Sequence, residues 1–355
     1  MSGGVDSSVA AFLLKENGFE VIGATLRLWK EARQERLSQC CGASDVGDAR
    51  HVAQQLRIPF YVFNMEEEFE RDVIRYFCEE YSRGRTPNPC ILCNEKIKFD
   101  AFLKKALDLE ADFIATGHYA RLEFDEETKR YLLKKGTDRR KDQSYVLFSL
   151  NQDQFLHTLF PLGQFKKEEV RKKALQLGLR VHDKPESQEI CFVHDPSYHS
   201  FLEQRLGDAI KPGLILDRTG NILGKHKGIS FYTIGQRRGL GLAKGKPLYV
   251  IGIDRDRNCI IAGEESEVYA DSFVVESVNW VTSLPSSPSI LSQVKIRYNH
   301  RGSEASLSIT GTNEVFVKFR SPQKAITPGQ AAVFYDGEIV LGGGWIKEVS
   351  VAHRG

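Results

Sequence analysis

Two short segments carry the residue types best suited to chemistry. The first, SGGVDSS at residues 2–8, places two glycines and three hydroxyls directly before a helical pattern. Glycines let the backbone approach an anion closely, and a helix N-terminus directs free N–H groups at it. Asp6 adds a carboxylate that could hold Mg²⁺. The lysine of GxxxxGK[ST] is absent, so this is not a Walker A loop. The segment predicts phosphate binding, and the alternative is an ordinary Ser/Gly turn before a capped helix.

The second segment, TPNPCILCNEKIKF at residues 86–99, carries Cys90 and Cys93. Each proline disfavours helix for the residue before it, so we expect a helix to begin at about Asn94. Cys93 would then lie near a helix N-terminus, where its thiol pKa is lowered. A third cysteine, Cys191, follows in SQEICFV at residues 187–193. Three histidines could complete a set of metal ligands, namely His118, His182 and His194. The remaining cysteines are expected to be structural or incidental, namely Cys40, Cys41, Cys78 and Cys259.

These residues alone leave the chemistry of the cysteines open. A zinc site normally needs four ligands, and no second CxxC is present. A redox dithiol, a metal site and an iron–sulfur site all remain alternatives.

The elements that must position these residues alternate between helix and strand over residues 1–120. Such a rhythm predicts a parallel sheet with helices on both faces, an α/β fold. A phosphate loop in this fold normally follows a strand, yet here the loop begins at residue 2. We therefore expect the first strand to be missing, which would weaken the sheet and ATP binding. The expected helices are 6–17, 45–56, 66–82 and 96–109, and the expected strands are 19–28, 59–64 and 112–116.

The rest of the chain changes character after about residue 205. A hairpin and a basic loop are expected over 121–150, and a Lys/Glu-rich helix over 151–177. Short strands separated by Gly, Pro and Asn then predict a small antiparallel barrel at the C-terminal end. The predicted domains are 1–205, 206–267 and 268–355. The barrel strands are expected at 272–281, 291–298, 305–310, 315–319, 331–335 and 338–342.

Composition limits the class of protein. The chain has 355 residues, 49 Lys+Arg against 47 Asp+Glu, and 41% hydrophobic residues, which fits two or three globular domains and excludes a disordered or collagen-like chain. No apolar run is long enough to span a membrane, and the first residues have neither the basic nor the apolar region of a secretory signal, so we expect none. Seven cysteines, an odd number, favour a reducing compartment, so we expect a cytoplasmic protein.

The small net charge of +2 hides one strongly basic segment. Residues 205–250 contain nine Lys or Arg and two Asp, with glycines interspersed. A localised basic stretch of this kind predicts a polyanion-binding surface, with a solvated face as the alternative.

The first motif resembles the PP-loop of ATP pyrophosphatases, which adenylate a substrate and release pyrophosphate. Further motifs occur in the order seen in the tRNA-specific 2-thiouridylase (MnmA/TrmU) family, and the resemblance spans nearly the whole chain. It implies an α/β PP-loop domain with a parallel sheet, a small β-rich domain and a C-terminal antiparallel β-barrel. The matching motifs, besides those above, are ATGHYAR (115–121), KDQSYVLF (141–148), FYTIGQRRGLG (231–241), VKIRYNH (294–300) and PGQAAVFYDGE (328–338).

The resemblance also implies an activity. The family replaces the 2-oxygen of the wobble uridine (position 34) with sulfur in tRNAs for Lys, Glu and Gln, through an adenylated uridine, giving 2-thiouridine, AMP and pyrophosphate. It implies ATP, Mg²⁺, tRNA and a persulfide sulfur carrier or cysteine desulfurase, and no membrane. By the same resemblance, Cys93 is the nucleophile and Cys191 the persulfide carrier. The implied ATP-binding residues are Met1, Ser2, Gly3, Gly4, Val5, Asp6, Ser7, Leu26 and Gly117; the implied tRNA contacts are Asn88, Pro89, Cys90, His118, Lys141, Asp142, Gln143, Arg297, Tyr298 and Gln330.

Two positions depart from the family pattern. Leu26 stands where Met is common, a mild apolar change. Cys90 stands where many members have Asp, and the acid–base role given to that Asp cannot simply transfer to a thiol. Cys90, Cys93 and Cys191 could instead hold a four-iron–four-sulfur cluster with one open iron. The alternative is a persulfide on Cys191 that Cys93 resolves as a disulfide.

Two other functions stay open at this level. One is a PP-loop ligase for a small metabolite, and the other is a tRNA-binding protein whose catalytic half is inactive.

Overall fold

A computed structural model describes residues 1–29, 43–185, 190–193, 198–242, 246–311 and 313–350. The chain divides into two compact units. The first contains Met1–Ile74, Cys90–His194 and Glu338–Val340. The second contains Arg75–Pro89, Asp195–Gly337 and Leu341–Gly355.

The helix that follows the glycine-rich loop is α1, Val5–Glu16, in the first unit. Gly18 ends it with φ of +85°, a left-handed conformation that glycine adopts without steric cost. The amide of Gly18 bonds to the carbonyl of Lys15 (3.0 Å), and that of Phe19 bonds to the carbonyl of Leu14 (3.1 Å). This Schellman arrangement confirms the predicted helix and its end.

Parallel strand pairs confirm the α/β prediction. β1, Gly23–Arg27, pairs in parallel with β2, Phe60–Asn64. β3, Ile114–Ala115, pairs in parallel with β6, Thr158–Leu159. The helix α2, Ala43–Leu56, lies between β1 and β2 in sequence, as the alternation predicts.

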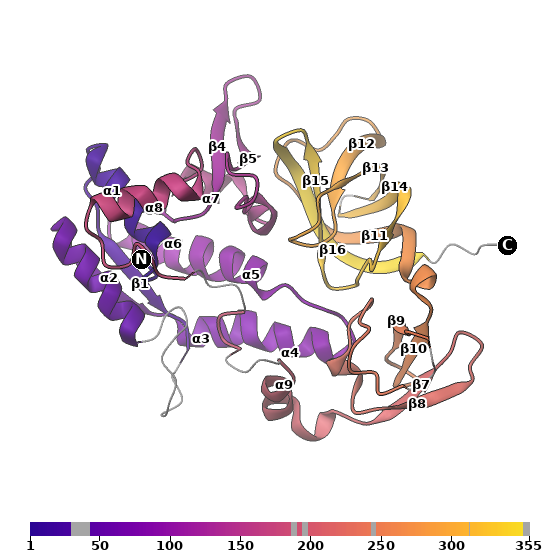
Figure 1. The fold of residues 1–355 in the computed structure, drawn as a ribbon. Helices are drawn as coiled ribbons and strands as arrows, with labels where there is room; N and C mark the ends of the chain where they lie inside the picture. Colours follow the sequence, from indigo (N-terminus) through magenta and orange to yellow (C-terminus); the bar gives the residue numbers. More distant parts are fainter. Residues whose placement is uncertain (30–42, 186–189, 194–197, 243–245, 312, 351–355) are drawn as a thin grey trace. The chain divides into compact units, whose positions relative to one another are not determined.

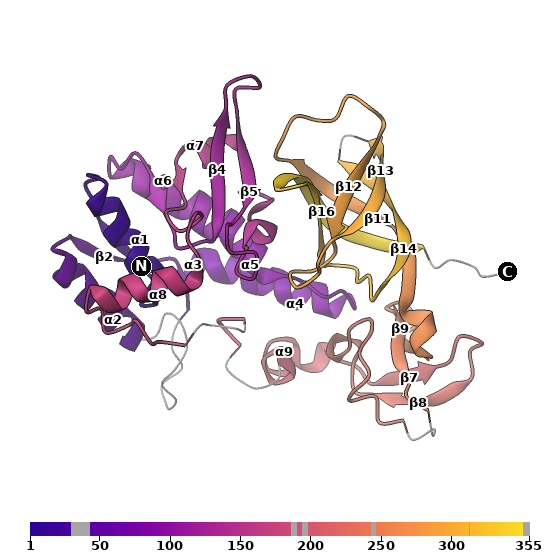
Figure 2. The same cartoon turned by 45° about the horizontal axis from the view of Figure 1, so that its top comes forward.

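Helices α1 and α8 lie against each other (Figure 2), and the core that they share consists largely of small and branched side chains. Helix α8 spans Lys167–Gln176. The shared core lies beside the glycine-rich loop and fixes where α1 begins. Its buried members are Val5, Val9, Ala10, Ala11, Leu13, Val52, Leu56, Tyr119, Leu162, Val170, Ala174, Leu179 and Val181.

Two helical runs contain π-helical turns. The first consists of α3 (Glu66–Phe69), a π segment (Glu70–Ile74) and α4 (Arg75–Ser82), which confirms the helix predicted over 66–82. The second consists of α5 (Pro89–Leu92), a π segment (Cys93–Ala101) and α6 (Phe102–Asp108). It begins five residues before the Asn94 expected from the sequence, because proline suits the first helical position: its φ is preset and its missing N–H would be unpaired there anyway.

The segment after β3 starts with the predicted hairpin, β4 (Ala120–Asp125) and β5 (Arg130–Lys135). A 3₁₀ turn at Ser144–Leu147 and helix α7, Gln152–Leu156, follow. The single helix predicted over 151–177 is wrong. Pro161 and Gly163 interrupt it, and β6 forms between α7 and α8. A Cβ on Gly163 would lie 2.0 Å from the Ala120 carbonyl oxygen, so the chain passes the hairpin too closely for a side chain.

The second unit holds a four-stranded sheet and a barrel. The sheet has the order β8-β7-β10-β9, with β7 and β10 parallel and the other pairs antiparallel. Arg237 and Arg238 of the basic segment are exposed. The elements are α9 (Tyr198–Leu206), a 3₁₀ turn (Gly207–Ala209), β7 (Gly213–Leu216), β8 (Ile222–His226), a 3₁₀ turn (Ile229–Phe231), β9 (Tyr249–Asp254), β10 (Cys259–Gly263) and a 3₁₀ turn (Glu265–Val268).

Six antiparallel strands close into the predicted barrel, because β11 pairs with both β14 and β16 (Figure 1). Alternate residues face inward, and the core includes Phe273, Val294, Leu307, Val317 and Phe334. The strands are β11 (Tyr269–Trp280), β12 (Ser289–Lys295), β13 (Ser303–Gly311), β14 (Glu314–Lys324), β15 (Ala331–Asp336) and β16 (Ile339–Ser350).

Within the described ranges, no helix is both long and apolar enough to cross a bilayer.

Candidate functional site

The glycine-rich loop leads into a helix whose first turn no side chain caps. Gly4, the N-cap, is extended (φ −99°, ψ 168°) and makes no side-chain cap bond. The hydroxyls fold back instead: Ser8 Oγ donates to the Gly4 carbonyl (2.8 Å), and Ser7 Oγ accepts from the Ser2 amide (3.0 Å). The loop is therefore shaped by its own serines, while the positive end of α1 stays available for an anion.

Close approaches of the backbone require glycine at two positions, Gly3 within the loop and Gly117 beside it. Gly3 has φ of +69°, and a Cβ there would lie 2.4 Å from the carbonyl oxygen of Asp45. A Cβ on Gly117 would lie 2.9 Å from Cβ of Asp6 and 3.0 Å from the amide nitrogen of Ser7. The structure thus brings Gly117 against the first turn of α1.

The other expected nucleotide residues lie along β1. The amino group of Met1 donates to the Ala24 carbonyl, and the Met1 carbonyl accepts from Thr25 Oγ1 (2.6 Å). Leu26 is half-buried on the same strand. Val5 is buried in the core of the unit, so its contribution to a ligand is its backbone amide.

Asp6 does not present a free carboxylate. Lys167 Nζ lies 2.7 Å from both of its oxygens, and the Tyr119 hydroxyl donates to Oδ1 (2.8 Å). The sequence suggested Asp6 as a ligand of Mg²⁺, but in the structure Lys167 binds both carboxylate oxygens, so this side chain does not fit a Mg²⁺ site.

A second lysine reaches the loop from residue 184. Lys184 Nζ donates to the Gly3 carbonyl (3.1 Å) and to the carboxylates of Asp45 and Asp48. Burial alone would lower the pKa of Lys184, but the two carboxylates raise it above its usual range, so the ammonium stays charged. Sequence reasoning missed both lysines, because no local motif marks them.

The expected activation of Cys93 by a helix N-terminus is corrected by the structure. The helix begins at Pro89, so Cys93 lies a full turn inside it and is 8% exposed. Burial raises the pKa of the Cys93 thiol, because the thiolate is poorly solvated there. Cys90, one turn earlier, is exposed.

Lys98 is a cation near these thiols. It lies in the same motif, although the sequence pattern assigned it no role. Its charge opposes the rise in the pKa of Cys93. Its Nζ donates to Asn94 Oδ1 (2.9 Å), and Asn94 Nδ2 donates to the Val146 carbonyl (3.0 Å), which holds both side chains in place.

His118 is buried and uncharged. Burial, with the charge of Lys98 as a smaller contribution, lowers the pKa of His118 well below its ordinary 6.5. Its Nδ1 shares a hydrogen bond with Thr116 Oγ1 (2.8 Å), and its ring lies 6.0 Å from that of Phe99. His118 can therefore hydrogen bond to a ligand but does not add a positive charge to the site.

Cys191 lies in the described stretch 190–193 and is half-buried. The neighbouring Phe192 packs edge-on against Phe69 at 5.6 Å, which anchors this end of the segment in the first unit. Ser187, Gln188, Glu189 and His194 lie outside the described residues, as do Cys40 and Cys41.

In the described part of the chain, no three His, Cys, Asp or Glu side chains gather closely enough to hold a metal ion. The arrangement of Cys90, Cys93 and Cys191 therefore does not fit a preformed cluster site.

Three expected tRNA residues form the loop after the β4–β5 hairpin. Asp142 is buried and accepts bonds from the Gly136 amide (3.0 Å) and from Ser144, so it shapes the loop. Gln143 Oε1 accepts from the Tyr119 amide (3.0 Å), which ties the loop to the ATGHYAR segment. Lys141 is half-buried beside them.

The second unit contains the remaining expected tRNA residues. Gln330 donates through Nε2 to the carbonyls of Thr86 (2.9 Å) and Pro87 (3.3 Å), directly before the expected base-facing residues Asn88 and Pro89. Asn88 is half-buried and Pro89 is buried. Arg297 Nη1 donates to the Lys324 carbonyl (3.0 Å). The Tyr298 ring is 38% exposed, so it lies outside the barrel core.

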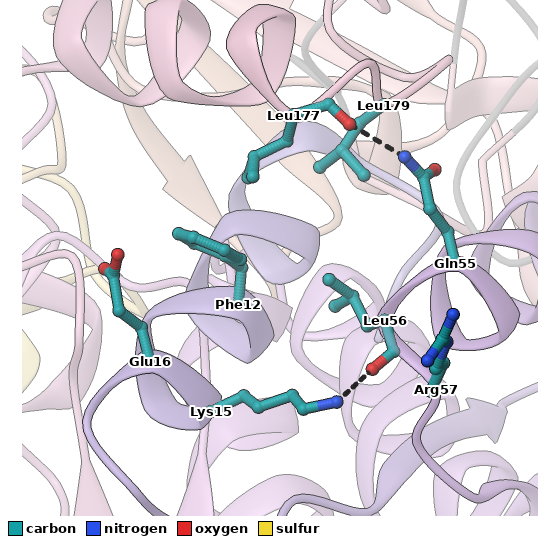
Figure 3. A pocket seen from close by; sticks show the side chains of 8 residues that line it. All are labelled: Phe12, Lys15, Glu16, Gln55, Leu56, Arg57, Leu177 and Leu179. Atoms are coloured by element: carbon teal, nitrogen blue, oxygen red, sulfur yellow. Dashed lines mark hydrogen bonds between the residues drawn. The ribbon is translucent and has the colours of Figure 1, made fainter.

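A pocket of about 490 Å³ lies at the other end of α1 from the loop (Figure 3). Apolar side chains such as Phe12 and Leu179 line it, and Lys15 bonds to the Leu56 carbonyl at its edge (2.6 Å). None of the site residues expected from the sequence lines this pocket.

Comparison with known proteins places all three parts of the chain. Residues 1–195 match the family model described as a tRNA methyl transferase HUP domain, residues 199–264 the PRC-barrel domain of that name, and residues 270–346 an aminomethyltransferase β-barrel domain. The chain is 50% identical over 350 residues to the tRNA-specific 2-thiouridylase MnmA of Acetivibrio thermocellus, covering 98% of each chain. It is 51% identical to the protein of that name from Halothermothrix orenii, with 98% of each chain covered, and to that from Natranaerobius thermophilus, with 99% of this chain and 96% of the relative covered.

Proposed function

Because the chain belongs to the tRNA-specific 2-thiouridylase family, we propose that it is an ATP-dependent tRNA sulfurtransferase that converts the wobble uridine of tRNAs for Lys, Glu and Gln to 2-thiouridine. One observation supports this most strongly. The uncapped start of α1, with Gly117 packed on it, lies in the same compact unit as Cys90, Cys93 and Cys191.

The first half of the reaction uses the loop. A carbonyl oxygen is a poor leaving group, so O2 of the uridine attacks the α-phosphorus of ATP and pyrophosphate leaves. The amides at the start of α1 stabilise the negative charge on the departing phosphates. Gly117, which packs against Asp6 and Ser7, and the apolar Leu26 would contact the adenosine.

The second half uses the cysteines. A persulfide on Cys191 attacks C2 of the adenylated uridine through its terminal sulfur, and AMP leaves with the former oxygen. The Cys93 thiolate then attacks Sγ of Cys191, which breaks the S–S bond and releases 2-thiouridine. A Cys93–Cys191 disulfide remains, and a thiol reductant and a new persulfide donor return the enzyme to its starting state.

RNA binding completes the proposal. The wobble base must leave the anticodon stack to reach a catalytic pocket. The exposed Arg237 and Arg238 suit phosphate contacts, and the exposed ring of Tyr298 suits stacking on a base. Asn88, Pro89 and Cys90 would face the target base, with His118, Lys141, Asp142, Gln143, Arg297 and Gln330 around the RNA. A persulfide carrier or cysteine desulfurase would be a transient partner.

The test measures AMP and pyrophosphate release with unmodified tRNA and a persulfide donor. We expect tRNA to stimulate both, and Cys93→Ala and Cys191→Ala to abolish 2-thiouridine while tRNA binding persists. Cys259→Ala, in the second unit, is the matched cysteine control and should keep thiolation.

Two outcomes would contradict the proposal. ATP turnover that ignores tRNA would indicate a ligase for a small metabolite. Tight tRNA binding with no AMP release would indicate an RNA-binding protein.

A further inference from the structure

The ion pair between Asp6 and Lys167 has no part in the reaction proposed above. Asp6 lies in the first turn of α1, and Lys167 Nζ contacts both of its carboxylate oxygens at 2.7 Å. The Lys167 side chain is only 8% exposed and that of Asp6 is 32% exposed. Burying an ammonium group costs free energy unless the group is paired with an opposite charge, so the buried Lys167 needs the carboxylate of Asp6.

The surroundings hold both partners in fixed positions. Lys167 is the first residue of α8, and its backbone amide donates to the buried carboxylate of Asp138 (3.1 Å). The Tyr119 hydroxyl donates to Asp6 Oδ1 (2.8 Å), and Lys167 Nζ also lies 5.7 Å from the centre of the Tyr119 ring. Since α1 and α8 share a core, the packing of the two helices holds Lys167 beside the loop.

The pair matters because of what the loop must bind. A carboxylate in the first helical turn suits the helix dipole, but it repels the negatively charged phosphates that the same turn attracts. Walker A loops carry their own lysine for phosphate, whereas residues 2–8 of this chain contain none. Lys167 supplies a positive charge at this place from a distant part of the chain.

We propose that Lys167 is a positioning residue of the nucleotide site, which neutralises Asp6 and so lets the loop accept the triphosphate of ATP. The inference rests on the proposed use of ATP. Lys167 Nζ donates to both carboxylate oxygens of Asp6, so the proposed effect of Lys167 is exerted through this carboxylate.

The experiment measures ATP affinity by calorimetry in EDTA, with the full-length protein and no tRNA. Lys167→Met leaves Asp6 uncompensated and should weaken ATP binding by about tenfold or more. In the double variant Asp6→Asn/Lys167→Met there is no charge to cancel, so affinity should return to within about threefold of the wild type. Lys172→Met removes an exposed lysine from the same helix and should leave affinity unchanged.

Two results would overturn the inference. Wild-type affinity in Lys167→Met would show that the pair does not affect ATP. A double variant as weak as Lys167→Met would assign the lysine to the phosphates directly.

If Lys167→Met does not fold, Lys167→Arg decides. It keeps the charge and should bind ATP within about threefold of the wild type, and loss of binding in a folded Lys167→Arg would overturn the inference as well. If the wild type binds no ATP even when Mg²⁺ is added in place of EDTA, the proposed function fails. The outcomes above concern only the role of Lys167.

Discussion

Replacing Gly3 with alanine tests the loop geometry on which ATP binding depends. Gly3 has φ of +69°, and the new Cβ would lie 2.4 Å, 2.8 Å and 2.9 Å from the O, Cα and C atoms of Asp45. All three are backbone atoms at the start of α2, so no side chain can rotate away. We expect the loop or the start of α2 to move, with loss of both stability and ATP affinity.

Two costs add up at this position. A non-glycine residue in the left-handed region costs about 1–2 kcal/mol. Overpacking against backbone adds about 1–3 kcal/mol. Gly3→Ala should therefore destabilise the first unit by about 2–5 kcal/mol.

Gly18→Ala is the matched control, because Gly18 has φ of +85° but no atom lies within 4 Å of the place that a Cβ would take. It carries the backbone cost alone, so we expect a loss of about 1–2 kcal/mol.

The assay measures two quantities. Hydrogen exchange of the α1 amides in urea gives the stability of the first unit, and titration with ATP gives the affinity. Gly3→Ala should lose about 1–3 kcal/mol more than Gly18→Ala and bind ATP about tenfold more weakly. Gly18→Ala should keep wild-type ATP affinity. Equal losses of stability, or normal ATP binding by Gly3→Ala, would refute the reasoning.

Three further predictions concern the cysteines, the buried histidine and the second unit. Iodoacetamide should modify the exposed Cys90 before the buried Cys93, and Lys98→Met should slow the modification of Cys93 further because the pKa of its thiol rises. Peptide mass spectrometry measures the order of modification, and Cys93 modified first would contradict this prediction. The pKa of His118 in the folded protein lies below 6.5, so below that pH the unfolded chain binds a proton that the native chain does not, and the free energy of unfolding falls with acid. Between about pH 7 and about pH 5, urea unfolding should show a smaller loss of this free energy in His118→Asn than in the wild type. An equal loss in both proteins would rule out this role of His118. Gln330→Ala removes the hydrogen bonds to the carbonyls of Thr86 and Pro87 and should destabilise the second unit by about 0.5–1.5 kcal/mol per bond. The urea midpoint of this unit measures the effect, and an unchanged midpoint would contradict the prediction.

Much of the fold follows from local pattern. The amphipathic run before Gly18, the alternation up to residue 120 and the six C-terminal strands all predict elements that the structure contains. Apolar periodicity and glycine placement carry enough information for these, because burial of one face decides the element.

The failures have local causes too. The helix predicted over 151–177 is divided into α7 and α8, and Pro161 and Gly163 lie between them. The prediction gave more weight to the Lys/Glu-rich composition than to these two helix breakers. The helix at Cys93 begins earlier than expected, because Pro89 starts a helix rather than preceding one.

The charges around the loop could not be predicted in this way. Lys167 meets Asp6 across 161 residues of sequence, and Lys184 meets Gly3 across 181. Such contacts depend on how segments far apart in the sequence pack together, which no spacing rule encodes. The same holds for Lys98, whose motif was recognised but whose effect on Cys93 depends on burial.

Nucleoside mass spectrometry for 2-thiouridine decides whether this chain thiolates tRNA. The purified protein would be incubated anaerobically with unmodified Glu tRNA, ATP, Mg²⁺, a thiol reductant and a cysteine desulfurase with cysteine, with and without added iron. We expect 2-thiouridine at position 34 without added iron, and none when Cys191 is replaced by alanine. Absence of 2-thiouridine with folded, ATP-binding protein, or its formation only when iron is supplied, would contradict the proposed reaction.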